Sequence, residues 1–242
     1  MTHVVAIHQP NFFPWLGYFD KIARSDSFVF LDDVQIQKTG GGWSNRVKML
    51  VSGIPKWVTA PIDRNYHGGR KINETRLLGQ SPWRENSLRI IQLSYKNAPH
   101  YSAAIELIEP LLMNSEDNLA AYNADAILAI ANELGISTTK CKWSSAVKHV
   151  GQSNERLVSI IRSLGGDTYM CGGGAVEYQD KGIFDMAAVT LIHQDYVPPI
   201  YSQHGSLSFL PGLSIVDVLM NLGIDGTRRL FETHLKLQRS AI

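Results

Sequence analysis

The feature that most restricts the fold is a pattern of strand, helix and strand at the start of the chain. Residues 4–7 are a continuous apolar run rich in β-branched residues, short enough to be a buried strand. Leu16, Phe19 and Ile22 then follow at helical spacing, and residues 27–31 return to strand character. This order predicts a βαβ unit, for which a parallel sheet with a right-handed crossover is the default.

The rest of the chain alternates between strand and helix patterns, without internal repeats or linker-like tracts. We therefore expect one α/β domain over residues 1–242, with a Rossmann-like parallel sheet and a helical insertion or lobe over residues 82–134. The predicted strands are 47–51, 56–62, 137–145, 167–171 and 190–196, and the predicted helices are 83–95, 101–113, 118–134, 152–166 and 213–223.

Composition excludes several classes of partner. The 242 residues contain 23 Lys and Arg against 22 Asp and Glu, a net charge of +1, which gives no general attraction to nucleic acid or an anionic membrane. Cys141 and Cys171 are too few for a zinc cluster or a disulfide framework, so reduced thiols are expected. The N-terminus lacks signal-peptide character, and no window reaches the roughly 18 apolar residues of a membrane span. We expect a cytoplasmic protein.

Polar side chains follow several predicted strands at the point where each strand ends. In a parallel sheet these ends share one edge, where ligands bind. We therefore expect one rim to hold the segments 8–11, 32–33, 171–174 and 193–195.

Four residues of this rim are candidates for catalysis: His8, Asp33, Cys171 and His193. An imidazole can titrate near neutral pH, although His8 could instead donate to a backbone carbonyl. Asp32 and Asp33 could act as acid and base, orient a ribose or cap a turn. Because adjacent residues in an extended chain point to opposite sides, one of the pair is expected to face the site. Two alternatives stay open for Cys171: it is either a nucleophile that an imidazole activates, or a buried and inert thiol.

Other residues are candidates for substrate binding. The glycines after Cys171 allow close backbone approach to an anion or acyl group, and Arg46 and Lys48 suit a phosphate, unless they belong to a solvated hairpin. Without an HxxxH or HxH spacing, no metal site is predicted from the histidines and aspartates. The substrate-binding candidates are Gln9, Asn11, Trp15, Tyr18, Asp32, Trp43, Asn45, Arg46, Lys48, Gly172, Gly173, Gly174 and Tyr178.

Motifs along nearly the whole chain resemble the WbqC-like family. The likeness is carried by HQPNFFPWLGYFDKIARSDSFVFLDDVQ, KTGGGWSNRVKM, the turn at 134–136, NERLVSIIRSLGGDTYMCGGGAVEYQD and FLPGLSIVDVLMNLG. The resemblance implies a role in bacterial O-antigen, lipopolysaccharide or other surface-polysaccharide clusters, where acyl-carrier proteins and amino-sugar enzymes are frequent neighbours. Gly40 to Gly42 lengthen one family loop, and the family turn after the late strand is serine- or glycine-rich, so the resemblance does not supply a catalytic Cys171.

The opening unit also looks like that of HIGH-type nucleotidyltransferases and pantothenate synthetase. In those folds two histidines bracket a glycine before the helix, whereas this chain reads Trp15-Leu16-Gly17-Tyr18. The likeness therefore implies the fold and not adenylyl transfer by the same residues.

Together these features predict a transferase that moves an acyl or aminoacyl group to the amine of a nucleotide-linked amino sugar. His8 or Asp33 would remove the amine proton, amides of residues 172–174 would stabilise the oxyanion, and Arg46 and Lys48 would hold the diphosphate. The donor candidates are an acyl-carrier protein or coenzyme A thioester, or ATP. The alternatives are ATP-dependent adenylation or nucleotidyl transfer, and a non-catalytic carrier or assembly factor. The helix at 213–223 is apolar on more than one face, which suits internal packing or a homodimer.

Overall fold

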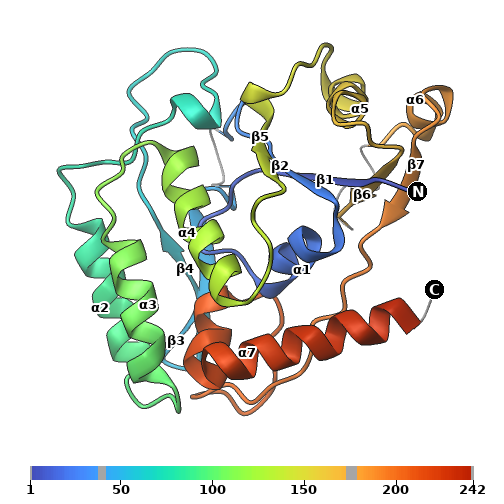
Figure 1. The fold of residues 1–242 in the computed structure, drawn as a ribbon. Coiled ribbons are helices and arrows are strands. Elements are labelled where there is room, and N and C mark those ends of the chain that lie inside the picture. The colour runs from blue at the N-terminus through green and yellow to red at the C-terminus, as the bar shows by residue number, and fades with distance from the viewer. Residues whose placement is uncertain (1, 38–41, 173–178, 241–242) are drawn as a thin grey trace. The chain divides into compact units, whose positions relative to one another are not determined.

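The computed structural model describes residues 2–37, 42–172 and 179–240 (Figure 1). The chain divides into two compact units. Unit 1 comprises Met1–Gln9, Gly17–Asp33 and Ile136–Val197, and unit 2 comprises Pro10–Leu16, Val34–Gly135 and Pro198–Ile242. Each unit is therefore assembled from segments that are far apart in the sequence.

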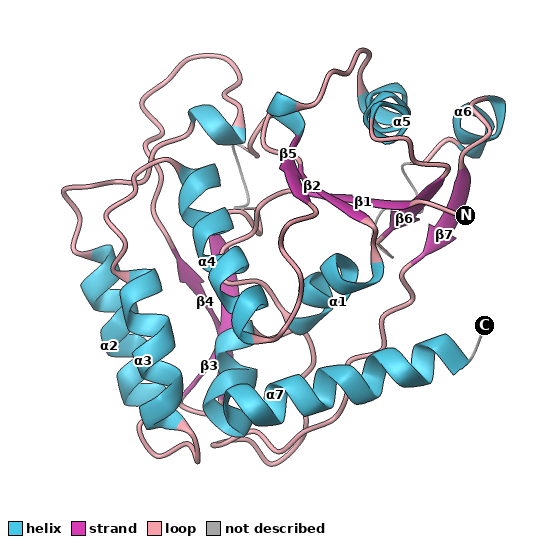
Figure 2. Ribbon diagram, viewed as in Figure 1, coloured by secondary structure: helices cyan, strands magenta, loops and turns pink. Residues whose placement is uncertain are grey.

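Unit 1 contains a five-stranded sheet in the order β5-β2-β1-β6-β7, in which every neighbouring pair is parallel (Figure 2). This arrangement confirms the predicted α/β fold with a Rossmann-like parallel sheet. The strands are β1 (Val4–His8), β2 (Ser27–Phe30), β5 (Cys141–Trp143), β6 (Thr168–Cys171) and β7 (Thr190–His193).

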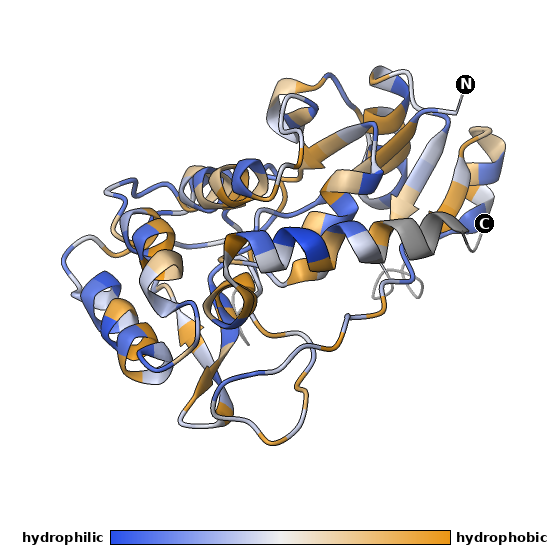
Figure 3. Cartoon of the chain, turned by 60° about the horizontal axis from the view of Figure 1, so that its bottom comes forward, coloured by the Kyte–Doolittle hydropathy of each residue, from blue (hydrophilic) through white to orange (hydrophobic). Residues whose placement is uncertain are grey.

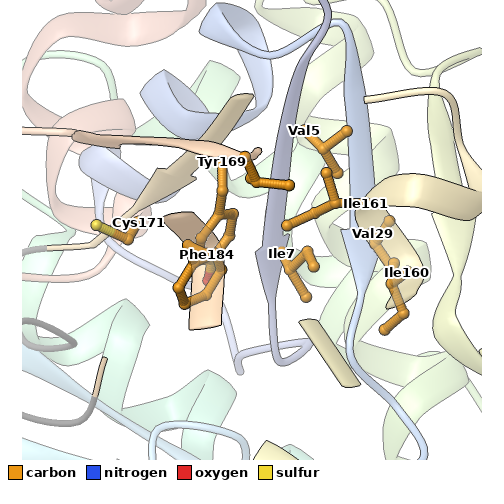
Figure 4. Close-up of a cluster of buried hydrophobic side chains, with 9 residues drawn as sticks. Val5, Ile7, Val29, Ile160, Ile161, Tyr169, Cys171 and Phe184 are labelled. Atoms are coloured by element: carbon orange, nitrogen blue, oxygen red, sulfur yellow. The ribbon is translucent and has the colours of Figure 1, made fainter. Parts of the chain in front are cut away.

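Helices flank this sheet and bury its apolar side chains. They are α1 (Leu16–Arg24), α5 (Ser153–Ser163) and α6 (Lys181–Met186), with a short 3-10 helix η2 (Ser144–Ala146) after β5. Val5 and Ile7 alternate along β1 and pack in one cluster with Ile160 and Ile161 of α5 (Figure 4). Side chains two residues apart on a strand point to the same face, so Val5 and Ile7 share one face of β1, while Ala6, which is also buried, points to the other face.

Unit 2 contains an antiparallel hairpin and four longer helices. The hairpin is formed by β3 (Arg46–Val51) and β4 (Ile54–Thr59). On α2 the buried side chains recur every fourth residue, at Trp83, Ser87, Ile91 and Tyr95, and α2 and α3 both mix apolar and polar residues (Figure 3). The helices are α2 (Trp83–Tyr95), α3 (Tyr101–Leu112), α4 (Leu119–Glu133) and α7 (Ile215–Ser240), with the 3-10 helix η1 (Ile72–Glu74).

Two helical features differ from the sequence prediction. The helix predicted to end at Gly223 continues to Ser240 after a break at that glycine, whose φ of 67° and ψ of 178° are not helical. Helix α6 was not predicted, because six residues are too few for a periodic pattern. The predicted single domain with a lobe at 82–134 stays a prediction, although α2, α3 and α4 begin and end within two residues of their predicted bounds.

Candidate active site

The predicted polar segments of unit 1 lie at the carboxyl edge of its parallel sheet. His8 ends β1, Cys171 ends β6 and His193 ends β7, while Asp32 and Asp33 follow β2. The chain leaves β1 toward β2 on one side, and β6 lies on the other side of β1, so the strand order reverses between β1 and β6. Ligands of open α/β sheets bind at such a switch point, beyond the carboxyl ends of the strands.

Asp32 and Asp33 form a hydrogen-bonded cluster with the segment that follows β5. Asp32 is buried and accepts bonds from the Ser144 hydroxyl (2.8 Å), the Ser145 backbone N–H (3.0 Å) and the Ser145 hydroxyl (2.7 Å). Asp33 lies 2.5 Å from the Ser144 hydroxyl and 3.0 Å from His149 Nε2, with Arg156 Nη1 at 3.8 Å. Asp32 therefore holds the turn of η2 in place, while Asp33 sits among a hydroxyl, an imidazole and a guanidinium.

Both carboxylates contact the same hydroxyl, in contrast to the expectation that adjacent residues would point to opposite sides. Strand β2 ends at Phe30, so Asp32 and Asp33 lie beyond the extended backbone in which side chains alternate. Because a serine hydroxyl carries one proton, Ser144 donates to one of the two carboxylates at a time and couples them.

Cys171 and His193 form a second pair at the ends of β6 and β7. The Cys171 Sγ lies 3.2 Å from His193 Nδ1 and 3.3 Å from the Ile192 carbonyl oxygen, to which the thiol donates. The thiol is free and fully buried, and burial raises its pKa, so the uncharged form dominates near neutral pH. This environment suits a structural thiol, and the catalytic roles predicted for Cys171 and His193 stay predictions.

His8 lies between these two groups. Its Nδ1 is 3.1 Å from the Gln9 carbonyl oxygen, so Nδ1 carries the proton and donates, and Nε2 is left as the acceptor. Burial, together with the charge of Lys21, lowers the pKa of His8 to about 3. The ring packs edge-on against buried Tyr18, whose hydroxyl donates to the same carbonyl at 2.9 Å. His8 is therefore a neutral imidazole at physiological pH, and Tyr18 holds the backbone beneath it.

Lys21 is a further residue of this site that was not predicted from the sequence, although it lies within the stretch HQPNFFPWLGYFDKIARSDSFVFLDDVQ. Lys21 is buried on α1, and its Nζ lies 3.3 Å from the carbonyl oxygen of Ile7 on β1. Burial lowers the pKa of the amine to about 8, while the nearby Cys171 acts in the opposite direction. A lysine in a helical pattern is normally assigned to solvent, so only its position three residues after the aromatic Tyr18, on the same face of α1, could have indicated burial.

Apart from Gln9 and Gly172, which belong to unit 1, the remaining predicted residues are in unit 2 or outside the described residues. Asn11 and Asn45 are buried, and the Asn45 side chain donates to the Ala60 carbonyl within the hairpin. Trp15 forms a β-bridge with Ser214. Gly173, Gly174 and Tyr178 lie outside the described residues, whereas Gly172 follows β6 directly.

Cations and tryptophans meet on one face of the β3 and β4 hairpin. The Arg46 guanidinium lies 4.2 Å from the centre of the Trp57 ring, and Lys48 Nζ lies 5.3 Å from it. Trp43 and Trp57 are 44% and 41% exposed, with ring centres 5.1 Å apart. This face presents both stacking surfaces and positive charge, and Trp57 joins the predicted residues Trp43, Arg46 and Lys48 there.

The described residues contain neither a cluster of metal ligands nor a helix that could span a membrane. No group of three or more His, Cys, Asp or Glu in that part of the chain could hold a metal ion. None of the helices described has the length and apolar content that a membrane crossing requires.

The fold and the polar edge define a Rossmann-like α/β protein with a candidate ligand site at the switch point of its sheet. A family model described as the WbqC-like protein family matches residues 9–229, and the chain belongs to that family. It is 31% identical over 225 residues to the "Uncharacterized protein Rv1507c" of Mycobacterium tuberculosis (strain ATCC 25618 / H37Rv), covering 91% of this chain and 94% of that protein. The search of solved structures gave no significant match.

Proposed function

We propose that this protein is a transferase that moves an acyl or aminoacyl group from an activated donor to the amine of a nucleotide-linked amino sugar. The supporting observation is the switch point itself. There, the neutral His8 and the backbone of Gly172 lie at the ends of adjacent strands β1 and β6 of a Rossmann-like sheet. Sheets of this topology bind nucleotides at that position.

The pathway is inferred from family membership and not from geometry. The resemblance of the sequence motifs to the WbqC-like family implies surface-polysaccharide clusters, in which amino sugars are acylated. Family membership alone names no reaction, so the donor and the acceptor are part of the proposal. We take a coenzyme A or acyl-carrier thioester as the donor.

The chemistry requires three things of the protein. The acyl carbonyl must be held beside the amine, the negative charge that develops on its oxygen must be stabilised, and the attacking nitrogen must lose a proton. The backbone amides that begin at Gly172 are proposed to stabilise the oxyanion. His8, with a pKa of about 3, is too weak a base to take the proton efficiently but can accept a hydrogen bond at Nε2.

The direct test is a turnover assay with purified protein. Nucleotide-linked amino sugars are incubated with coenzyme A and acyl-carrier thioesters, and mass spectrometry records the acylated product together with the released thiol. We expect wild-type protein to give product, and Asp33→Asn and His8→Ala to slow it at least tenfold. Failure of wild-type protein to acylate any acceptor of the panel would contradict the proposal.

A second candidate function is adenylation of an acid with ATP. The strand order of unit 1 favours it, because the order corresponds to the first five positions of a dinucleotide-binding sheet, and the bound nucleotide could itself react. Release of pyrophosphate from ATP in the presence of small carboxylic acids, without thioester consumption, would favour adenylation. A non-catalytic carrier role is the third alternative. It requires full activity of the His8→Ala and Asp33→Asn variants in a reconstituted pathway, together with loss of activity in a surface variant.

A further inference from the structure

Lys21 is a buried amine that lacks a carboxylate partner among the described residues. Its side chain is in the core of unit 1, yet its Nζ appears in none of the ion pairs of that part of the chain. The adjacent Asp20 pairs with Arg24 at 3.4 Å and accepts from Gln194 at 2.9 Å. Buried lysines are rare unless they are paired, so this arrangement needs a reason other than stability.

The hydrogen bonding of the amine is also incomplete within the described residues. An ammonium group has three donors, and Nζ donates one hydrogen bond there, of 3.3 Å, to the Ile7 carbonyl oxygen. A bond of that length is at the weak end of the normal range for N–H to O. A neutral amine needs fewer acceptors than an ammonium, and a bound substrate would supply partners that the described residues do not.

The amine lies at the switch point, beside Gly172, which has no side chain. A Cβ placed on Gly172 would lie 3.7 Å from the Lys21 Nζ, which is the one atom of the described residues that it would meet within 4 Å apart from its chain neighbours. A reacting group placed over Gly172 would therefore touch Nζ. Ile7 of β1 and Gly172 after β6 thus bracket the lysine from the two strands at which the sheet order reverses.

We propose that Lys21 is a catalytic residue, whose neutral amine takes the proton that the acceptor amine loses during acyl transfer. This inference rests on the proposed function. Its ionisable neighbours are Cys171 of β6, whose charge would favour the protonated amine, and His8 of β1, whose protonation the lysine opposes. With His8 neutral and the Cys171 thiol buried, Lys21 is the group at this position best suited to exchange a proton.

Lys21 alone can accept and return the one proton that is transferred during the reaction. The acceptor nitrogen attacks the thioester carbonyl carbon, the new C–N bond forms, and the carbonyl electron pair moves to oxygen. The nitrogen, now positive, gives a proton to the Lys21 lone pair. When the carbonyl reforms, the C–S bond breaks and the thiolate leaves, and the Lys21 ammonium returns the proton to it. The products are an amide and a thiol, and the neutral lysine is regenerated.

The kinetic test compares wild-type protein with Lys21→Arg, Lys21→Met and Gly172→Ala in the thioester assay. Arginine keeps the positive charge but stays protonated, so it separates proton transfer from charge. We expect kcat of both Lys21 variants to fall about 100-fold or more, with KM changing little. Gly172→Ala should also lose activity, because its methyl group fills the space beside Nζ at an ordinary contact distance. Gly79→Ala is the control, because a Cβ there meets nothing within 4 Å.

A second measurement does not depend on turnover. Pulse labelling with acetic anhydride at about pH 8.5, near the pKa of about 8, followed by peptide mass spectrometry reports whether Lys21 reacts in the folded protein. We expect Lys21 to be acetylated, and Gly172→Ala to reduce this several-fold while Gly79→Ala does not.

The outcomes separate the two proposals. Turnover by wild-type protein with full kcat in Lys21→Arg would overturn the role of Lys21 and leave acyl transfer standing. No turnover by wild-type protein, together with the expected labelling, would overturn acyl transfer while supporting Lys21 as the reactive amine of this site. Lys21 that stays unlabelled until the protein unfolds would overturn the inference.

Discussion

At the scale of single residues, the most informative feature is the burial of charge on α1. Asp20 and Lys21 are adjacent and both buried, but they have different partners: Asp20 pairs with Arg24, and Lys21 reaches only the Ile7 carbonyl among the contacts described for it. Burial without an opposite charge penalises the protonated amine, which is the cause of its lowered pKa. The fold therefore retains a group that makes it less stable than it could be.

This penalty predicts how stability depends on pH. The amine has a pKa of about 8 when folded and 10.5 when unfolded, so between these values the unfolded chain binds more protons. The free energy of unfolding should therefore rise with pH between about pH 8 and 10.5. Below this window the cost of burying the protonated Lys21 amine is fully present. Lys21→Met should raise the free energy of unfolding at pH 7 by up to about 3 kcal/mol and flatten its change between about pH 8 and 10.5. Urea titrations at several pH values measure this. The exposed Lys56→Met is the control, and an unchanged pH profile in Lys21→Met would contradict the account.

Ser144 is the second residue whose removal has a defined consequence. Its buried hydroxyl lies between the carboxylates of Asp32 and Asp33 and also accepts from the Asp32 N–H at 3.1 Å. Ser144→Ala should cost about 1–3 kcal/mol of stability, because buried hydrogen-bonding groups lose a partner. Exposed Ser102→Ala should stay within about 0.5 kcal/mol of wild type. If Ser144→Ala and Ser102→Ala unfolded at the same urea concentration, the stability of the Asp32 and Asp33 cluster would not depend on the Ser144 hydroxyl.

At the scale of elements, the break in α7 depends on one glycine. Gly223 has a φ of 67°, and a Cβ there would lie 2.8 Å from His100 Nδ1. Gly223→Ala should therefore lower the free energy of unfolding by about 1–3 kcal/mol through backbone strain. The double variant Gly223→Ala, His100→Ala removes the clash and keeps the strain, so it should recover only part of the loss. Thermal or urea unfolding measures both, with Gly79→Ala as the control, and a Gly223→Ala variant as stable as wild type would contradict this reading.

Most strands and helices were predictable because each buries a periodic apolar set. The short apolar run of Val4–His8 and the four-residue spacing of the buried side chains on Trp83–Tyr95 are local patterns. They can be recognised in the sequence without knowing which other elements pack against them. Glycine was read as the end of the last helix because glycine commonly follows a helix, whereas Gly223 only interrupts it. The internal-packing alternative for that helix holds, since Ile215, Val216 and Leu219 are buried within the chain, while a homodimer stays a prediction.

The candidate site was predictable only as far as strand ends can be predicted. The rule that parallel strands end at one edge correctly placed His8 and Cys171 at the ends of β1 and β6, and Asp33 just after β2. It did not predict their partners, because Ser144, His149 and Arg156 come from a segment more than 110 residues after Asp33. Lys21 was not predicted as a site residue for the same reason, because its burial depends on strands β1 and β6 and not on its own helix.

At the scale of the molecule, unit 1 is built from segments on both sides of a long intervening stretch. Met1–Gln9 and Gly17–Asp33 supply the first two strands, and Ile136–Val197 supplies the other three. The switch point therefore forms only when the third segment has joined the first, because β6 pairs with β1. The similarity to the mycobacterial relative covers 91% of this chain and 94% of that protein, so it extends over most of the segments that form the sheet as well as the intervening stretch.

The most direct test of the account is the kcat for thioester-dependent acylation of a nucleotide-linked amino sugar by wild-type protein and by Lys21→Arg. The account predicts acylated product and free thiol in equal amounts from wild-type protein, and a fall in kcat of about 100-fold or more in the variant. Acylation that proceeds equally fast in Lys21→Arg, or an absence of product from correctly folded wild-type protein, would contradict it.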